Sequence, residues 1–374
     1  MKRDFRITDN ECLFEAVQHA EAVLPFFCWE HDVLNEGDYS SFHLQAQWEG
    51  LTGVCQSLSN RGIESRVVSG DIVEQLDLLF KLFPFDVLYS HQETGNLVTF
   101  QRDQNVQKWC RKQDVKWVEM NPSSVMRGGD ADRRRLKLRQ ADYRKQEPLP
   151  IPDFSHLEPL VPGIANQPPS WKAVTSVVSK FKGRTLNPSL TKVNEKSAHA
   201  TLTSFLYERG IGYSGGISSP NTAFVHGSRL SSHLAWGTLS LRTVFAHLDQ
   251  RRLEVKDCQD RSHWLRSLRA FESRLFWRDH FIQRLEAFPV MEKKPLNSAY
   301  ADLKYEDDPE ILNAWIHGRT GYPMVDACMR CLQDNGFLNF RMRAMVVSFA
   351  CYGLHLSWRT IHEPLARLFH DYEP

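Results

Sequence analysis

Apolar runs and amphipathic stretches alternate along the first 125 residues. Short apolar runs that are typical of buried strands lie at 22–29, 65–70, 85–90 and 115–120. Patterns with helical spacing lie at about 11–20, 42–58, 71–83 and 102–112. Strands that alternate with helices predict a parallel sheet covered by helices, so we expect an α/β domain over residues 1–126. The series begins with a helix, where a doubly wound domain normally begins with a strand. We therefore expect this domain to lack its first strand.

Prolines and basic residues set apart the segment 127–195. The run RGGDADRRRLKLRQADYRK at 127–145 carries eight basic and three acidic residues, and prolines punctuate the part that follows. This composition predicts an extended linker rather than a packed element. We expect its basic section to be a solvated connector, and a contact with nucleic acid is the alternative.

Helical spacing dominates from residue 196 onward. Trp264, Leu268, Phe271 and Leu275 recur on one side of a helical pattern that runs to residue 285. The pattern predicts an all-helical domain over residues 196–374. The chain stops at HDYEP, which has neither a helix stop nor a tail-like composition, so we expect this domain to be incomplete at its C-terminus.

Composition restricts the class of protein and its partners. The 374 residues include 46 basic and 45 acidic ones, so a nucleic-acid contact would need a local basic patch rather than a global field. No apolar run approaches the roughly 20 residues of a membrane span, and the start carries no apolar signal core. We expect a cytoplasmic monomer that makes no membrane contact.

The eight cysteines predict neither a disulfide framework nor a metal site. They are scattered along the chain, which is typical of a reducing compartment. Cys328 and Cys331 share a helix face, but no second pair at finger spacing supplies the four ligands of structural zinc. We therefore expect no metal.

The stretch HGSRLSSHLAWGTLS at 226–240 is a candidate anion site. Small hydroxyl residues let a backbone approach an oxyanion, and the hydroxyls of Ser228 and Ser231 can donate to it. Arg229 and the first amides of a helix would add positive potential. A plain serine N-cap beside a solvated Arg229 is the alternative.

Six stretches, in order along almost the whole chain, resemble the photolyases and cryptochromes, which are FAD-containing flavoproteins driven by blue light. They are KRDFRITDN at 2–10, ETGNLVTFQRD at 93–103, GSRLSSHLAWGTLSLR at 227–242, LFWRDHF at 275–281, AWIHGRTGYPMVDACMRCL at 314–332 and NFRMRAMVVSF at 339–349. The resemblance implies a Rossmann-like α/β domain of the antenna type, joined by the long linker to an all-helical FAD-binding domain. It also leaves open a second antenna chromophore of the folate or deazaflavin type.

The resemblance implies a set of FAD-binding residues. The loop 227–231 would hold the pyrophosphate at a helix N-terminus, with a tyrosine upstream and a further arginine nearby. An arginine–aspartate pair would flank the isoalloxazine ring, and Glu373 stands where the family often has aspartate. The implied cofactor-binding residues are Tyr213, Gly227, Ser228, Arg229, Leu230, Ser231, Arg278, Arg343, Asp371 and Glu373.

The chain departs from the repair enzymes of this family where they contact damaged DNA. Arg274 stands at the position of a glutamate and Phe340 at that of an asparagine, so the two groups that steady a cyclobutane dimer are replaced. Trp277 remains as a stacking surface, and Phe271 belongs to the same substrate side. The light-driven electron relay matches Trp358 and, as a substitute, Tyr305, while its inner residue would lie beyond Pro374.

These matches and departures favour one function and leave two others open. An intact phosphate loop beside a lost repair site favours a cryptochrome-like photoreceptor that signals through a partner protein. A DNA photolyase, which is a light-dependent carbon–carbon lyase, is the alternative, with damaged or single-stranded DNA as its partner. A truncated, non-functional paralogue is the third possibility, so whether the protein is an enzyme stays open.

Overall fold

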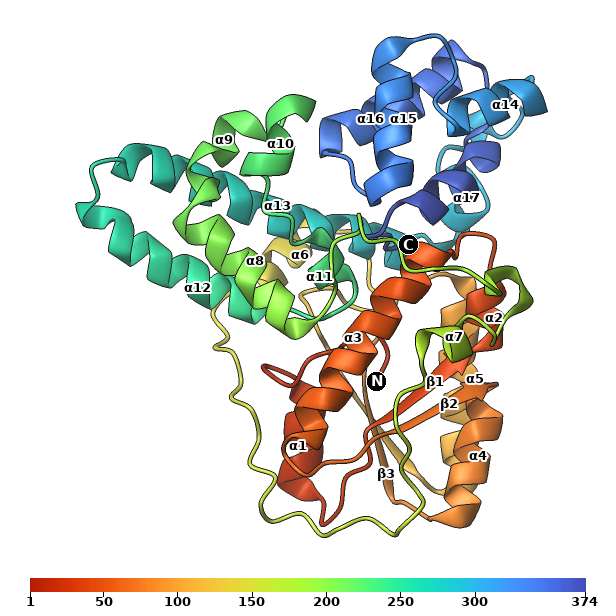
Figure 1. The fold of residues 1–374 in the computed structure, drawn as a ribbon, viewed down its shortest axis with the longest axis vertical. Helices are drawn as coiled ribbons and strands as arrows, with labels where there is room; N and C mark the ends of the chain where they lie inside the picture. The colour runs from red at the N-terminus through yellow and green to blue at the C-terminus, as the bar shows by residue number, and fades with distance from the viewer.

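The computed structural model describes residues 1–374, and its N-terminal part alternates strands with helices (Figure 1). The sequence pattern predicted eight of these nine elements to within a few residues and missed only the short α2. The elements are α1 (Glu11–His19), β1 (Phe26–Glu30), α2 (His31–Asn35), α3 (Ser41–Ser59), β2 (Arg66–Gly70), α4 (Ile72–Leu82), β3 (Val87–His91), α5 (Leu97–Gln113) and β4 (Lys116–Met120).

The four strands form two parallel pairs rather than one sheet. β1 pairs with β2 so that Phe26 lies opposite Arg66, and β3 pairs with β4 so that Val87 lies opposite Lys116. No hydrogen bond joins β1 to β3. The predicted parallel arrangement is confirmed, but the single continuous sheet is not.

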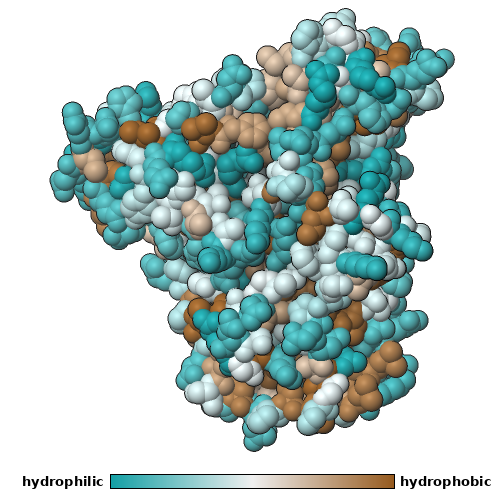
Figure 2. Space-filling model, in the orientation of Figure 1, coloured by the Kyte–Doolittle hydropathy of each residue, from teal (hydrophilic) through white to brown (hydrophobic).

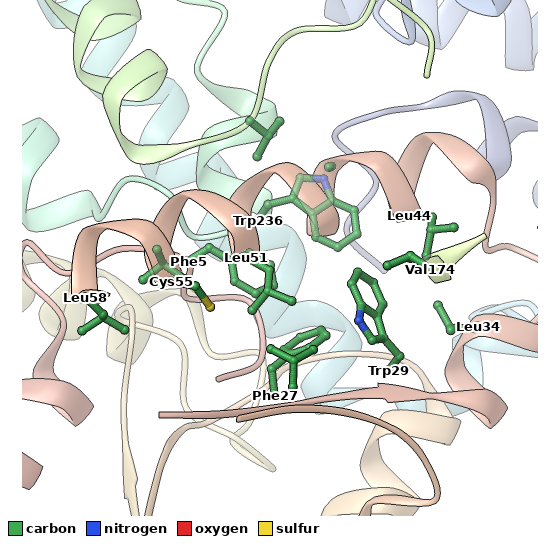
Figure 3. Close-up of a cluster of buried hydrophobic side chains, with 14 of the residues drawn as sticks. Phe5, Phe27, Trp29, Leu34, Leu44, Leu51, Cys55, Leu58, Val174 and Trp236 are labelled. Atoms are coloured by element: carbon green, nitrogen blue, oxygen red, sulfur yellow. The ribbon is translucent and has the colours of Figure 1, made fainter. Parts of the chain in front are cut away.

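Helices cover both faces of these strands. Phe27 and Trp29 point from β1 toward α3 and join the largest apolar cluster, which also holds Leu44 and Leu51 (Figure 3). On the opposite face, Phe26 packs against a second cluster built mainly from α4 and α5. Because side chains alternate along a strand, burial of neighbours on opposite faces explains why β1 reads as one apolar run.

The segment predicted as an extended linker contains helices, which corrects that expectation. α6 (Arg133–Tyr143) occupies the basic run, and α7 (Trp171–Val174) and the 3₁₀ turn η1 (Ser179–Phe181) follow. Asp132 caps α6, and Leu136 and Tyr143 are buried. Two buried apolar positions seven residues apart thus hold the helix in place despite its charged composition. Between α6 and α7 the chain is irregular and follows the outside of the molecule (Figure 1).

No helix of the structure combines the length and the apolar character needed to cross a membrane.

The remaining chain is helical, as predicted, and divides into two groups of helices with separate apolar cores. The first group contains α8 (Glu195–Tyr207), η2 (Arg209–Gly212), α9 (Tyr213–Gly216), α10 (Pro220–His226), α11 (Ser231–Ala235), α12 (Leu241–Glu254), η3 (Val255–Asp257) and α13 (Arg261–Ala287). The turns η4 (Pro289–Glu292) and η5 (Ser298–Tyr300) lead to the second group, which contains α14 (Pro309–Ile316), α15 (Pro323–Asn335), α16 (Phe340–Ser348), the π-helical turn η6 (Phe349–Gly353) and α17 (Trp358–Leu368).

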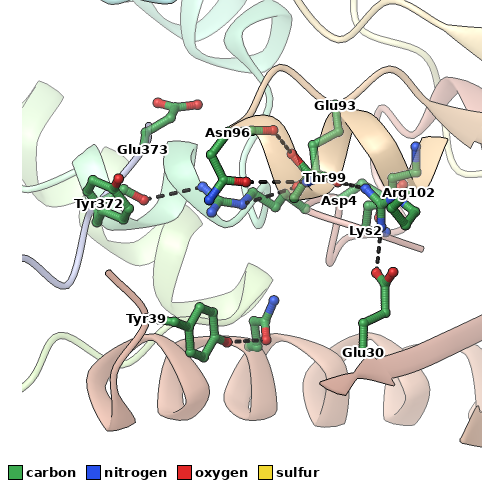
Figure 4. A network of polar contacts seen from close by, with 12 residues as sticks. Lys2, Asp4, Glu30, Tyr39, Glu93, Asn96, Thr99, Arg102, Tyr372 and Glu373 are labelled. Atoms are coloured by element: carbon green, nitrogen blue, oxygen red, sulfur yellow. Dashed lines mark hydrogen bonds and ion pairs between the residues drawn. The ribbon is translucent and has the colours of Figure 1, made fainter. Parts of the chain in front are cut away.

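A buried ionic network lies at the carboxyl ends of the strands (Figure 4). Arg102 on α5 pairs with Glu30 at the end of β1 and with Glu93 just after β3, and Lys2 pairs with Asp103 at 2.9 Å. Burial opposes the charged form of Glu93, but the neighbouring cations outweigh burial and lower its pKa to about 2. The network therefore fixes where the strands end relative to α5.

Removal of the central cation should destabilise the fold. We expect Arg102→Met to lower the free energy of unfolding at pH 7 by about 3–5 kcal/mol, because buried carboxylates lose their counter-charge. Arg135→Met is the control, since Arg135 makes only exposed ion pairs with Asp130 and Asp132, and we expect a loss of about 1 kcal/mol or less. Urea unfolding followed by circular dichroism measures both.

The pH dependence of the same variant follows from the lowered pKa of Glu93. A carboxylate whose pKa falls on folding stabilises the native state fully above its ordinary pKa of 4.5, and this stabilisation disappears as the pH falls through about 2. The difference between parent and Arg102→Met should therefore shrink as the pH is lowered from 4.5 toward 2. A difference that stays constant over this range would contradict the assignment.

Candidate functional site

The loop 227–230 between α10 and α11 has a fixed and unusual shape. Arg229 adopts a left-handed backbone conformation with φ of 60°, and a Cβ at Gly227 would lie 2.4 Å from the carbonyl oxygen of Ala223. The guanidinium of Arg209 donates to the carbonyl oxygen of Gly227 and, at 2.7 Å, to that of Ser228. The sequence interpretation missed Arg209, because an arginine eighteen residues before the loop gives no local signal.

Arg229 is a cation without a carboxylate partner. Its guanidinium packs against the rings of Phe224 and Phe337, at 4.7 and 4.2 Å from their centroids, and reaches only the hydroxyl of Thr191 at 3.4 Å. Burial lowers the pKa of Arg229, and the nearby Asp371 opposes this effect. A partly buried positive charge in this position attracts an anion, which favours the anion-site interpretation over that of a solvated arginine.

An ion pair from the second helical group lies near this loop. Arg343 on α16 donates to Oδ2 of Asp371 at 2.6 Å and to the carbonyl oxygen of Leu338 at 2.8 Å. Burial raises the pKa of Asp371, but Arg343 and the hydroxyl of Ser231 outweigh burial and lower it. The side chain of Asp371 is 3% exposed and is therefore a buried carboxylate that stays ionised.

Several buried polar atoms around this ion pair have no partner. They are Oδ1 of Asp371, both ring nitrogens of His370 and Nε2 of His233. Burial lowers the pKa of His233 to about 4 and that of His370 to about 3, so both rings are neutral near pH 7. Native proteins satisfy nearly all buried polar groups, so these atoms are available for hydrogen bonds to water or to a polar ligand. The flavin ring system and the pyrophosphate of FAD are such a ligand.

Three predicted site residues form part of the helical core instead. Tyr213 packs edge-on against Phe205 and Phe271, with ring centroids 5.4 and 5.8 Å away, and Leu230 is fully buried. Phe271 is only 2% exposed, so its ring cannot contact DNA, and this corrects its placement on the substrate side. For Leu230 only the main chain is left to meet a cofactor.

Arg278 and Glu373 form an ion pair with each other. Arg278 also lies 3.7 Å from the buried Asp279, whose second carboxylate oxygen accepts a hydrogen bond from Ser124. Arg278 and Glu373 line a small cavity of about 70 Å³ together with Lys2 and other residues of the α/β part. The charge of Arg278 is thus compensated by carboxylates at the boundary between the two parts of the chain, which argues against a role at the FAD phosphates.

Exposed aromatic and cationic groups occupy the predicted DNA side. Trp277 is 46% and Phe340 64% exposed, and the guanidinium of Arg274 lies 5.7 Å from the centroid of the Trp277 ring. The amide of Asn339 is not available there, because it donates to the carbonyl oxygen of Ile217 at 2.9 Å. This surface can stack and attract anions, but it presents neither a carboxylate nor a free amide.

The predicted electron relay remains a prediction. Trp358 is half-buried at the first turn of α17, and the guanidinium of Arg359 lies 4.9 Å from its ring centroid. Tyr305 is half-buried in the segment before α14. No aromatic contact joins either ring to another ring of the chain.

Comparison with protein families matches both parts of the chain. Residues 1–139 match the family described as DNA photolyase, and residues 271–374 match the FAD binding domain of DNA photolyase. A deoxyribodipyrimidine photo-lyase of Alkalihalophilus pseudofirmus is 25% identical over 395 residues, covering 100% of this chain and 76% of that protein. A cryptochrome DASH of Idiomarina loihiensis is 26% identical, covering 96% of this chain and 78% of that protein. A photo-lyase of Thermus thermophilus is 35% identical, but over 39% of this chain and 32% of its own length.

Solved structures show the same fold over the whole chain. A cryptochrome of Synechocystis has a TM-score of 0.81 at 20% identity, and this chain covers 78% of it. An archaeal photolyase of Sulfolobus tokodaii, described with two FAD molecules, has a TM-score of 0.77 at 21% identity, with 79% of it covered. Both alignments cover 100% of this chain. With matches to both family models and with relatives aligned over 96–100% of this chain, the chain belongs to the cryptochrome/photolyase family of FAD-binding flavoproteins.

Proposed function

We propose that the protein holds FAD between its two helical groups. The observation that carries this proposal is the set of buried, unpartnered polar atoms of Asp371, His370 and His233 near the unpaired cation of Arg229. The loop 227–231 and Arg229 would meet the phosphates, while Arg343 and Asp371 would meet the ring system. When bound, the flavin supplies blue-light absorption and one-electron chemistry.

The protein's own residues would bind and orient this cofactor. Arg209 keeps the loop in one shape through the two carbonyl oxygens of Gly227 and Ser228. Asp371, already ionised, presents a free carboxylate oxygen to an N–H donor, and Arg343 keeps that carboxylate from turning away. The neutral His233 and His370 add ring nitrogens without adding charge.

We further propose that light triggers a signal rather than DNA repair, so that the protein is a cryptochrome-like photoreceptor. Support comes from the guanidinium of Arg274 and the ring of Phe340 on the exposed surface, where repair enzymes of the family present a carboxylate and an amide. A guanidinium does not give up its proton near neutral pH, and a phenyl ring donates no hydrogen bond. Arg274 can therefore hydrogen-bond to a dimer but cannot protonate its radical anion, and Phe340 can only stack on it.

A route for such a signal starts at the carboxylate of Asp371. The next residue, Tyr372, donates its hydroxyl to Asp38 of the α/β part at 2.8 Å, and its carbonyl oxygen accepts from Arg3 at 3.2 Å. A change of charge or hydrogen bonding at Asp371 therefore reaches the contact between the two parts through a single peptide unit. A partner protein that binds across this contact would sense it.

Binding of damaged or single-stranded DNA is the second candidate function. The exposed Trp277 and Phe340 are suitable for base stacking, and Arg274 adds positive charge beside Trp277. The basic helix α6 packs against the same group of helices through Tyr143. These features support DNA contact but not catalysis on DNA.

The proposed cofactor site predicts a change in FAD affinity. Asp371→Asn removes the charge that orders Arg343 and one acceptor of the proposed site, so we expect FAD to bind about 10- to 100-fold more weakly. Asp326→Asn is the matched control, since Asp326 is equally well hydrogen-bonded, to Thr320 and Gly321, within the same helical group. Titration followed by quenching of flavin fluorescence measures both variants. Equal affinities for parent and Asp371→Asn would show that the flavin lies elsewhere.

A further prediction separates signalling from repair. The FAD-loaded parent should split cyclobutane dimers in a defined oligonucleotide no faster under blue light than in the dark. The double variant Arg274→Glu, Phe340→Asn should gain light-dependent splitting, because preorganised polar groups of this kind contribute about two to three orders of magnitude in rate.

A second double variant controls for the added carboxylate and amide as such. Arg341→Glu with Phe340→Asn places the same groups on the exposed face of α16 but leaves Arg274 in place. It should remain inactive. Efficient repair by the unmodified protein would overturn the photoreceptor proposal and establish the photolyase activity.

A further inference from the structure

The ring of Tyr372 is held in one position at the boundary between the two parts of the chain. It stacks on the ring of His43, with centroids 5.6 Å apart and planes at 23°, and its hydroxyl donates to Oδ2 of Asp38 at 2.8 Å. The preceding residue is Asp371, whose carboxylate we propose to meet the flavin ring, and consecutive Cα atoms lie about 3.8 Å apart. An oxidisable side chain is therefore one residue away from the candidate cofactor.

Two further oxidisable rings surround His43. The ring centroid of Tyr39 lies 5.2 Å and that of Trp236 5.9 Å from the centroid of the imidazole. The face of the molecule in Figure 2 is largely hydrophilic, but these rings lie beneath the surface, since His43 and Trp236 are 0% and Tyr39 is 6% exposed. Burial lowers the pKa of His43 to about 4, so the imidazole is neutral near pH 7. Three candidate electron donors thus share one neutral, buried ring.

Of the two tyrosines, only Tyr372 donates to a group that can take its proton. A phenol that loses an electron becomes a strong acid, so a positioned base decides whether the oxidation proceeds. Asp38 is 9% exposed and forms no ion pair, so its carboxylate is free to accept a proton. Burial and Asp38 both raise the pKa of Tyr372, so the phenol keeps its proton until it is oxidised. Tyr39 donates instead to the amide oxygen of Gln47, which is not a base near pH 7 (Figure 4).

The surroundings of Trp236 oppose its oxidation. Its indole N–H donates to the carbonyl oxygen of His370 at 2.8 Å, and a carbonyl oxygen does not take up the proton. The guanidinium of Arg3 lies 4.7 Å from its ring centroid. A radical cation on Trp236 would therefore face a second positive charge in a buried environment, where charges interact strongly. The electrostatics of the group favour Tyr372 as the place from which an electron is removed.

We infer that Tyr372 is an electron donor to the photoexcited flavin and that Asp38 accepts its proton. The inference rests on the proposed binding of FAD against Asp371 and adds the source of the electron. In this step the O–H bond of Tyr372 breaks. Its electron passes to the flavin, which is the oxidant, and its proton passes along the existing hydrogen bond to Oδ2 of Asp38. The protein then holds a neutral tyrosyl radical beside a carboxylic acid, and the return of one electron and of the proton restores the pair.

The same step changes the contact between the two parts of the chain. Asp38 belongs to the α/β part, whereas Tyr372 follows the last helix of the helical part. After the proton has moved, the acid O–H of Asp38 donates to the oxygen of the tyrosyl radical, so the hydrogen bond between the parts reverses its direction. The negative charge of Asp38 disappears at the same time. Light absorbed at the flavin is thereby converted into a change of charge at the contact that a partner protein would sense.

Flash photolysis of the FAD-loaded protein tests this inference. Blue light should produce the absorption band and the electron paramagnetic resonance signal of a neutral tyrosyl radical, and deuterated tyrosine rings should narrow that signal. Tyr372→Phe keeps the stacked ring but has no phenol to oxidise, so it should give no tyrosyl signal. Asp38→Asn keeps a hydrogen-bond acceptor but removes the base, so the radical should form about 100-fold more slowly.

Tyr39→Phe is the matched control. Tyr39 contacts the same imidazole of His43 but donates to Gln47, so its removal should leave the yield of the tyrosyl radical unchanged. Quenching of flavin fluorescence measures the FAD affinity of each variant. Tyr372→Phe and Asp38→Asn should bind FAD as the parent does, which separates a loss of the electron donor from a loss of the cofactor.

The outcomes distinguish this inference from the proposed function on which it rests. FAD that binds without a tyrosyl signal in the parent, or with the full signal in Tyr372→Phe, would overturn the inference alone. Loss of light-driven electron transfer in Trp358→Phe but not in Tyr372→Phe would also overturn it and would assign the electron to the predicted relay. A parent that binds no FAD would overturn the proposed function and, with it, this inference.

Discussion

The five residues Phe369–Glu373 hold the molecule together, because their backbone and side chains contact every other part of it. The carbonyl oxygen of Phe369 accepts from His43 on α3, and that of His370 accepts from the indole of Trp236, both buried. These two bonds tie the end of the chain to the largest apolar cluster, which spans the α/β part and α11. α17 adds a further contact with the α/β part, in which the hydroxyl of Ser40 donates to the carbonyl oxygen of Arg367 at 2.7 Å.

Successive side chains of the same segment contact different parts of the molecule. Asp371 and Glu373 neutralise Arg343 and Arg278 of the two helical groups, while Tyr372 turns to Asp38 of the α/β part. Breaking a buried ion pair typically costs about 3–5 kcal/mol, whereas a single exposed one contributes about 1 kcal/mol or less. The burial of Asp371 therefore makes its ion pair with Arg343 costly to break. A cofactor bound against it would be coupled to the contact between the two parts.

The sequence predicted the features that depend on local pattern. Periodicity alone located the strands and most helices, and small and hydroxyl residues marked the loop 227–231. It did not predict α6, because charged residues fill that helix and only Leu136 and Tyr143 report its packing. For Phe271 the pattern was the better guide, because it placed this residue on the apolar side of its helix, whereas the resemblance assigned it to the substrate side.

The contacts that define the candidate site could not be predicted from the sequence for a different reason. Arg209 holds the loop 227–230, and His370 lies beside Asp371, yet neither belongs to a motif of its own. The partners of such residues are set by the way helices pack, over separations that no short pattern spans. The resemblance to a family supplied Arg343 and Asp371 as a pair, and the geometry adds that one oxygen of Asp371 is left free.

The first residues of the chain connect the ends of the strands to the candidate cofactor site. Lys2 pairs with Asp103 in the network at the carboxyl ends, and the guanidinium of Arg3 lies 4.7 Å from the ring centroid of Trp236 while donating to the carbonyl oxygen of Tyr372. Tyr372 directly follows Asp371, the buried carboxylate of the candidate site. A cofactor bound against Asp371 would therefore lie next to a segment that contacts both parts of the chain.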